Sequence, residues 1–223
     1  DADRVIDAAG QRILPGGIDP HTHLDAPYDG LRGGDSIFSG TRAAAYGGTT
    51  CIVDFAAGGE SLPERVEKRR RYFERERPVV DFGLHCVYGS TGAEQVEQIQ
   101  RLRSSGASSV KYYMNNGDAC SDGVLFALLK ACAQEKITVC LHAENESLAG
   151  YFTQKLKYSG RTDWIDFPDS RPAICELEAV QRACALAREA GAQIYFMHLT
   201  TASAAAFLAG RRGEGLSVFG ETC

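Results

Sequence analysis

Residues 109–145 read SVKYYMNNGDACSDGVLFALLKACAQEKITVCLHAEN, and they determine the fold class that we predict. The two ends of this stretch, SVKYYMN (109–115) and ITVCLHAEN (137–145), are short and rich in β-branched and aromatic residues, as is typical of strands. The middle, DGVLFALLKACAQEK (122–136), is long enough for a helix and opens with aspartate. A strand, a helix and a second strand in this order indicate a β-α-β unit of a parallel sheet.

The same alternation continues in both directions along the chain. Further strands are predicted at 17–25, 49–56, 80–89, 193–200 and 216–223, with helical runs between them. From Lys111 to His142 is 31 residues across one strand-to-strand step, and from His21 to Lys111 is 90 residues across three steps. A β-α-β unit needs about 30 residues, so one unit repeats.

The step from His142 to His198 is longer, at 56 residues. We therefore predict an inserted, partly helical segment at 151–172, which contains the only tryptophan, Trp164. Its aromatic and proline residues suit a lid, an oligomer contact or a packed surface segment, and the sequence leaves these three open.

Two architectures fit repeated β-α units, a doubly wound open sheet and a (β/α)8 barrel. No G-x-G-x-x-G turn follows the first predicted strand, and ionisable residues recur near the ends of several strands, as in barrel enzymes. We predict an α/β fold, an incomplete (β/α)8 TIM barrel with about seven of its eight strands. The barrel occupies residues 15–223, and residues 1–14 are the remnant of a small N-terminal β-sandwich domain.

Composition narrows the class of protein. The 223 residues are 44% hydrophobic and 24% charged, which is typical of a folded globular chain. A net charge of -5 argues against nucleic acid and anionic membrane as partners. The N-terminus lacks the features of a signal peptide, and no apolar run approaches the roughly 18 residues of a membrane span, so we expect a cytoplasmic protein. Eight scattered cysteines without a C-x-x-C motif suit small buried side chains in a reducing compartment.

Four of the five histidines lie in strand contexts. His21 and His23 are two residues apart, so in a strand their imidazoles point to one face, where they could bind a metal or form ordinary hydrogen bonds. His142 and His198 each end an apolar run and would singly be core histidines. Together, the four would converge on one rim of a barrel, as a metal site requires. His85 lies before the end of its strand, and we interpret it as structural.

Lys111 interrupts a run that predicts a strand covered on both faces. A buried lysine has a lowered pKa, and its neutral amine can react with carbon dioxide to give a carbamate with two oxygens for two metal ions. The other interpretation is a lysine near the strand end whose ammonium reaches solvent. The sequence leaves both open.

Several runs together carry a resemblance to a known family. They are PGGIDPHTHLDAPYDG (15–30), GTRAAAYGGTTCIVDF (40–55), VKYYM (110–114), LHAEN (141–145), SRPAICELEAV (170–180) and MHLTT (197–201). Their order over nearly the whole chain resembles the dihydropyrimidinase and hydantoinase branch of the amidohydrolase superfamily.

This resemblance implies a centre of two divalent metal ions, usually zinc. His21 and His23 would hold the first metal, His142 and His198 the second, and carboxylated Lys111 would bridge them. A hydroxide between the metals would attack a cyclic amide or ureide of the dihydropyrimidine or hydantoin type and open it to an N-carbamoyl amino acid. The family also implies a homo-oligomer, a tetramer.

The sequence departs from the family pattern in two places. Asn116 stands where the family has a tyrosine that contacts the substrate, and an amide N–H can still donate a hydrogen bond there. The family's last ligand, an aspartate that also acts as general base, is expected beyond Cys223. We therefore expect the sequence to be part of a chain about twice as long, and expect these 223 residues alone to be inactive.

Other functions stay open at this point. Dihydroorotase and allantoinase are related alternatives within the superfamily. A non-catalytic scaffold of the neuronal collapsin response mediator type, which resembles dihydropyrimidinase, is an alternative from another class. The five ligand positions kept in this sequence argue against the scaffold.

Overall fold

The computed structural model describes residues 3–28, 31–59, 61–89, 96–115 and 121–222. The chain divides into two compact units, and each is described by itself. The smaller unit comprises residues 1–54 and 73–83, and the larger unit comprises residues 55–72 and 84–223.

Each of the seven predicted strands is present. They are β1 (Gly17–Thr22), β4 (Thr49–Ala56), β5 (Asp81–Val87), β6 (Ser109–Tyr113), β7 (Thr138–His142), β8 (Ile194–Phe196) and β9 (Val218–Gly220). The main helices between them are α1 (Ile37–Tyr46), α2 (Leu62–Arg75), α3 (Ile99–Leu102), α4 (Asp122–Glu135), α5 (Glu146–Tyr158), α6 (Ala173–Ala190) and α7 (Ala202–Gly213). The predicted alternation of strands and helices is therefore confirmed.

In the smaller unit, β1 pairs with β4 in parallel, with Thr22 opposite Asp54. The chain approaches β4 closely just before β1, because a Cβ atom on Gly16 would lie only 2.2 Å from the side chain of Thr50. Only glycine fits there, which explains the P-G-G sequence ahead of the first strand. A short antiparallel pair, β2 (Pro27–Tyr28) and β3 (Leu31–Arg32), follows β1.

Helix α1 packs its first turn into this unit. It begins after Ser36, whose Oγ accepts a hydrogen bond from the Ser39 backbone N–H at 3.1 Å and so caps the helix. Thr41 is buried, and its Oγ1 accepts a hydrogen bond from the backbone N–H of Val79. The rings of Phe73 and Phe82 stack with centroids 4.8 Å apart.

In the larger unit, β5, β6, β7, β8 and β9 pair in that order, and every pair is parallel. The register places Lys111 opposite Cys140 and Tyr113 opposite His142. The first four residues of β6 are buried, as expected for a parallel sheet that is covered on both faces. The pairing of β6 with β7 therefore holds the side chains near the carboxyl ends of these two strands at a fixed spacing.

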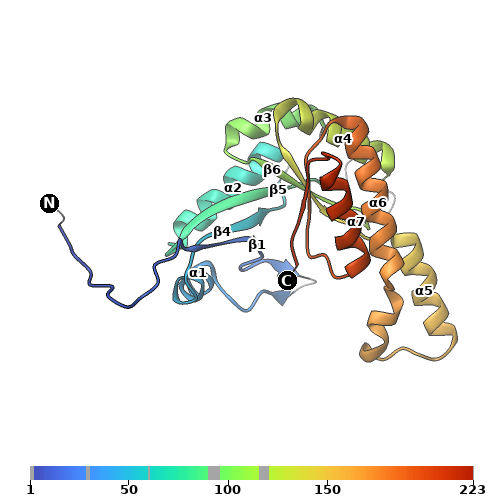
Figure 1. Ribbon diagram of the computed structural model, residues 1–223, viewed down its shortest axis with the longest axis horizontal. Helices are drawn as coiled ribbons and strands as arrows, with labels where there is room; N and C mark the ends of the chain where they lie inside the picture. The colour runs from blue at the N-terminus through green and yellow to red at the C-terminus, as the bar shows by residue number, and fades with distance from the viewer. Residues whose placement is uncertain (1–2, 29–30, 60, 90–95, 116–120, 223) are drawn as a thin grey trace. The chain divides into compact units, whose positions relative to one another are not determined.

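The helices of the larger unit follow one another around its sheet. Figure 1 shows α4, α6 and α7 as neighbours, and α6 contacts both of the others. Helix α4 begins after Ser121, whose Oγ accepts from the Val124 N–H, and α6 ends at Gly191 in the left-handed conformation that glycine favours. Capping and packing thus agree with the helix limits in the sequence.

The predicted insertion between β7 and β8 is confirmed as a partly helical segment. It contains most of α5 and the 3₁₀ helix η4 (Trp164–Ser170), which pack on each other. Arg161, between the two helices, forms ion pairs with Asp166 and Asp169 of η4, and its backbone N–H donates to the Leu156 carbonyl of α5 at 3.0 Å. Trp164 is exposed.

Residues 3–16 contain neither helix nor strand and are mostly exposed. The assignment of residues 1–14 to a separate β-domain stays a prediction. Within the described ranges, no helix is both long enough and apolar enough to cross a membrane.

Most of the described cysteines are small core side chains, as predicted. Cys86, Cys132, Cys140, Cys175 and Cys184 are buried free thiols, and Cys51 is half-buried. Burial raises the pKa of Cys86 to about 12, although nearby Arg65 opposes the shift. Such thiols are unreactive near neutral pH. Cys120 and Cys223 lie outside the described residues.

Candidate metal centre

His21 and His23 converge at the end of β1. The two Nε2 atoms are 3.2 Å apart, and the ring centroids are separated by 5.1 Å. Both imidazoles therefore lie on one face of the strand, as the alternation predicts. Two nitrogens bound to one tetrahedral zinc at the usual bond length would be about 3.3 Å apart. The observed separation fits two ligands of one metal.

Asp54 stabilises the backbone next to this histidine pair. Thr22, between the two histidines, points away from them, and its hydroxyl donates to the Val53 carbonyl on β4. Asp54 Oδ2 accepts the Leu24 backbone N–H at 2.8 Å and also contacts the Thr22 hydroxyl at 3.3 Å. Asp54 is only 1% exposed, so these bonds fix the turn that follows His23.

Sequence reasoning did not single out Asp54. The available signal was an aspartate inside the apolar run CIVDFA, because an ionised carboxylate is almost never fully buried without partners.

A second pair forms in the larger unit. His142 Nδ1 lies 3.0 Å from His198 Nε2, and the rings meet edge to face with centroids 4.6 Å apart. This nitrogen separation also suits two ligands of one metal. His142 is the last residue of β7, whereas His198 follows the end of β8.

The backbone of His198 is strained. Its φ angle is 41°, in the left-handed region, which costs a residue with a Cβ about 1–2 kcal/mol. Such a conformation persists only where surrounding contacts fix it, and it is found most often at functional sites.

Lys111 is buried in β6, with 1% exposure, so its ammonium does not reach solvent. Its Nζ lies 2.9 Å from Met197 Sδ, 4.9 Å from the centre of the Tyr113 ring and 5.7 Å from that of Phe55. The contact with Tyr113 shows that the two side chains lie on one face of β6. Burial lowers the pKa of Lys111 to about 8, against an opposing effect of Cys140 and Glu221. A neutral amine is therefore accessible near physiological pH.

Glu144 connects His142 to a polar network that sequence reasoning also missed. Its Oε2 accepts the Asn115 amide N–H at 2.7 Å and lies 3.5 Å from His142 Nε2. Arg171 Nε pairs with the other carboxylate oxygen at 3.2 Å. Hydrogen bonding to His142 is the main reason that the pKa of Glu144 is lowered, with Asn115 and Arg171 acting in the same direction and burial against it. Glu144 is therefore an anion.

His85 agrees with its structural interpretation. It is buried, with Nδ1 at 2.6 Å from the Ser109 hydroxyl and its ring beside that of Phe55. A hydrogen bond at Nδ1 and a ring contact thus both fix this side chain within the core.

The five predicted metal ligands thus form two pairs and a buried lysine. His21 and His23 belong to the smaller unit, and Lys111, His142 and His198 to the larger. In the part of the chain that the structure describes, no three or more His, Cys, Asp or Glu side chains form a metal-binding group. Asn116 lies outside the described residues, so its role as a substrate contact stays a prediction.

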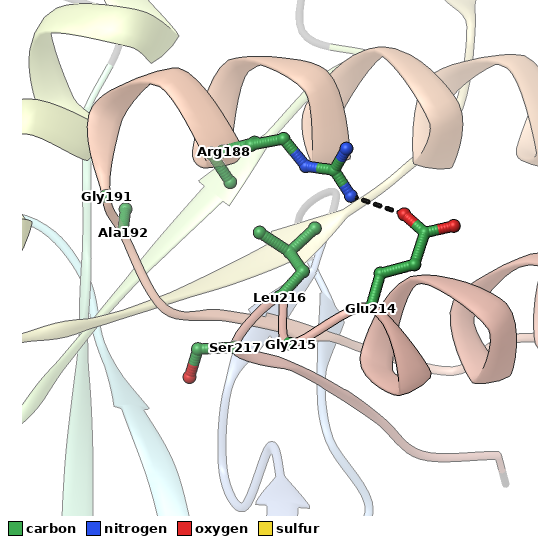
Figure 2. A pocket seen from close by; sticks show the side chains of 8 residues that line it. Arg188, Gly191, Ala192, Glu214, Gly215, Leu216 and Ser217 are labelled. Atoms are coloured by element: carbon green, nitrogen blue, oxygen red, sulfur yellow. Dashed lines mark hydrogen bonds and ion pairs between the residues drawn. The ribbon is translucent and has the colours of Figure 1, made fainter.

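A pocket of about 480 Å³ opens elsewhere in the larger unit (Figure 2). It lies where α6 and α7 end and β8 and β9 begin, and it contains an ion pair between Arg188 and Glu214. His142 and His198 are near the opposite, carboxyl ends of β7 and β8. In a barrel enzyme the carboxyl ends carry the chemistry, so this pocket is separate from it.

Comparison with known proteins places the chain in a family. Residues 12–207 match the family described as the amidohydrolase family. The D-hydantoinase of Geobacillus stearothermophilus is 39% identical over 224 residues, covering 98% of this chain and 47% of the relative. Dihydropyrimidinase 1 of Caenorhabditis elegans is 36% identical, covering 97% of this chain and 46% of the relative.

Solved structures agree. A D-hydantoinase structure superimposes with a TM-score of 0.92 at 34% identity, over 100% of this chain and 50% of that one. A second, from Bacillus sp. AR9, gives 0.86 at 40% identity, over 94% and 47%. The predicted fold class, an incomplete TIM barrel with seven parallel strands, is confirmed. The chain spans about half the length of the relatives that it matches, and it belongs to the amidohydrolase family.

Proposed function

We propose that the protein catalyses the metal-dependent hydrolysis of a cyclic amide or ureide, of the dihydropyrimidine or hydantoin type, to an N-carbamoyl amino acid. Membership of the amidohydrolase family and relatives named D-hydantoinase and dihydropyrimidinase support this substrate class. The observation that carries the proposal is geometric: two histidine pairs have nitrogen separations of 3.2 Å and 3.0 Å, and Lys111 is buried on β6, the strand that pairs with the strand of His142.

The donor set fits two divalent metal ions. We assign His21 and His23 to one metal and His142 and His198 to the other, with carboxylated Lys111 as the ligand of both. Zinc is the proposed metal, because imidazole nitrogen and carbamate oxygen are ligands that it accepts. When bound, such metals polarise a carbonyl and lower the pKa of water.

The protein's own groups prepare this chemistry. Lys111 first loses one proton to become a neutral amine. Its Nζ then attacks the carbon of carbon dioxide: an N–C bond forms, one C=O π bond breaks to leave its electron pair on oxygen, and the nitrogen releases a second proton to water, which leaves a carbamate anion. Burial favours this step because it destabilises the ammonium. Asp54 holds the turn after His23, and Glu144 lies beside the His142 imidazole. Asn116 is the proposed donor of a hydrogen bond to the substrate carbonyl.

We further propose a homotetramer, which the family resemblance implies, a cytoplasmic location, and a division into an N-terminal β-domain segment (1–14) and a barrel segment (15–223). Light scattering after gel filtration of the intact protein tests the tetramer.

The proposed activity is tested with a panel of dihydrouracil, hydantoin, dihydroorotate and allantoin. The intact, zinc-loaded protein should open dihydrouracil or hydantoin and release an N-carbamoyl amino acid. A preference for dihydroorotate or allantoin would instead indicate a dihydroorotase or an allantoinase. The absence of turnover across the panel, with zinc bound, would contradict the enzyme and favour a scaffold.

A further inference from the structure

The segment Ser170–Glu178, S-R-P-A-I-C-E-L-E, has no place in the proposed ligand set, yet it contacts both histidine-bearing loops of the larger unit. It runs from the end of η4 into the first turns of α6. We call residues 142–145 the His142 loop and residues 198–201 the His198 loop.

The segment contacts the His142 loop at three points. Arg171 pairs with Glu144, which in turn lies beside His142. The backbone N–H of Asn145 donates to the Cys175 carbonyl at 2.8 Å. The Asn145 side-chain amide donates to Glu178 Oε2. Main-chain and side-chain bonds together fix this loop on the start of α6.

The His198 loop is held mainly by one carboxylate, while the Leu199 backbone N–H donates to the Glu221 carbonyl at 2.8 Å. Glu176 Oε2 accepts the backbone N–H and the hydroxyl of Thr200, both at 2.9 Å. Its Oε1 accepts the backbone N–H of Thr201 at 2.9 Å and the hydroxyl at 2.6 Å. Four bonds to an anion are strong and directional. They fix the backbone immediately after His198, whose left-handed φ needs such support.

We propose that Ser170–Glu178 is a brace that sets the separation of His142 and His198, with Arg171 and Glu176 as its positioning residues. The inference deepens the proposed function and rests on it, because it takes this pair to bind a metal. Groups behind metal ligands commonly control affinity, and their loss weakens binding 10–100-fold. One segment that contacts both loops links the two ligands.

The test measures metal affinity in the intact, metal-free protein. Zinc is titrated against a chromophoric chelator, and the absorption spectrum of bound Co²⁺ reports the ligand geometry. Glu176→Gln replaces an acceptor oxygen by an N–H donor, and Arg171→Met removes the guanidinium. Each should weaken one of the two bound metals by about 10–100-fold and change the Co²⁺ spectrum, while the other metal binds as before.

Glu214→Gln is the matched control. Glu214 also forms an ion pair with an arginine of α6, Arg188, but at the other ends of the strands (Figure 2). This variant should bind both metals as the wild type does. Thr200→Val removes a single hydroxyl hydrogen bond to Glu176 and should give a smaller loss of metal affinity. It replaces Glu176→Gln as the test if that variant does not fold.

Different results would contradict the proposed function and the proposed brace. If His142→Ala still binds two metals with unchanged affinity, the proposed function is wrong at this pair. If His142→Ala loses a metal but Glu176→Gln, Arg171→Met and Thr200→Val all keep wild-type affinity and spectrum, the brace is overturned. A lower melting temperature with unchanged metal binding would also overturn it, because that result indicates a purely structural role.

Discussion

The two histidine pairs reach similar nitrogen separations by different means. His21 and His23 are neighbours on one strand, and strand alternation alone brings their rings together. His142 and His198 are 56 residues apart, and their convergence requires β7 and β8 to pair and two loops to be held. The first pair therefore depends on local geometry, and the second depends on tertiary contacts.

Their supports differ in the same way. Behind the first pair, one buried carboxylate, Asp54, bonds the turn after His23. At the second pair, Glu144 contacts the His142 imidazole and pairs with Arg171, Glu176 bonds the His198 loop, and His198 adopts a strained backbone. We therefore expect the second pair to be the more sensitive to substitutions at distant residues.

The largest effect is expected at Lys111, which we propose to serve both pairs. Lys111→Ala should reduce hydrolysis by about a thousandfold or more, since a metal centre without a ligand loses charge stabilisation worth several kcal/mol. Steady-state kinetics measure this loss, and a short carboxylic acid should restore part of the activity by replacing the carbamate. Lys130→Ala, on the exposed face of α4, is the control and should retain full activity. Unchanged turnover in Lys111→Ala would exclude the bridging role.

The next effect distinguishes metal-binding from structural histidines. His21→Ala and His142→Ala should each lower the zinc content, measured by plasma mass spectrometry, from two ions toward one. His85→Ala should keep both ions but lower the free energy of unfolding by about 1–3 kcal/mol, because Ser109 loses a buried partner. Loss of zinc from His85→Ala alone would reverse our assignment.

A smaller effect separates the supports of the two pairs. Asp54→Asn should weaken one metal by about 10–100-fold, because the amide is a weaker acceptor for the Leu24 N–H. In the His142→Ala variant, Asp54→Asn should weaken binding of the remaining metal, which we assign to His21 and His23. In the His21→Ala variant, Asp54→Asn should leave the affinity of the remaining metal, which we assign to His142 and His198, unchanged. Zinc titrations of both double variants would contradict separate supports if the two combinations behaved alike.

The smallest effects are expected from variants that change one helix cap in each compact unit and leave both histidine pairs unchanged. Ser36→Ala and Ser121→Ala each remove the side-chain cap of a helix, α1 in the smaller unit and α4 in the larger. Each should lower the free energy of unfolding by about 1 kcal/mol in urea titrations. Zinc affinity should not change in either variant, and a change would show that capping and metal binding are coupled.

The sequence predicts the repeating part of the fold well. Strand β4 was predicted at its observed limits, because β-branched residues and flanking turn residues define it on their own. The spacing from Lys111 to His142 matches one β-α-β step, and the register confirms the adjacency of their strands. β8 is shorter than predicted, since its chain leaves the sheet at Phe196, before His198.

The supports of the site could not be predicted in the same way. Glu176 bonds Thr200 and Thr201, which lie more than twenty residues along the chain, and no local pattern announces such a bond. The burial of Lys111 stayed open in the sequence because a lysine near a strand end can reach solvent; packing of Met197, Tyr113 and Phe55 around Nζ decides it. Histidine is enriched among the few non-glycine residues with positive φ, but such residues are too uncommon for the residue type alone to predict the left-handed φ of His198.

The most direct test of the central claim is a crystal structure of the intact, zinc-loaded protein with anomalous scattering measured at the zinc edge. Our account predicts two anomalous peaks, one bonded by His21 and His23 and one by His142 and His198, with continuous density for a carboxylated Lys111 in contact with both. A single peak, or two peaks with an unmodified Lys111 in contact with neither, would contradict it.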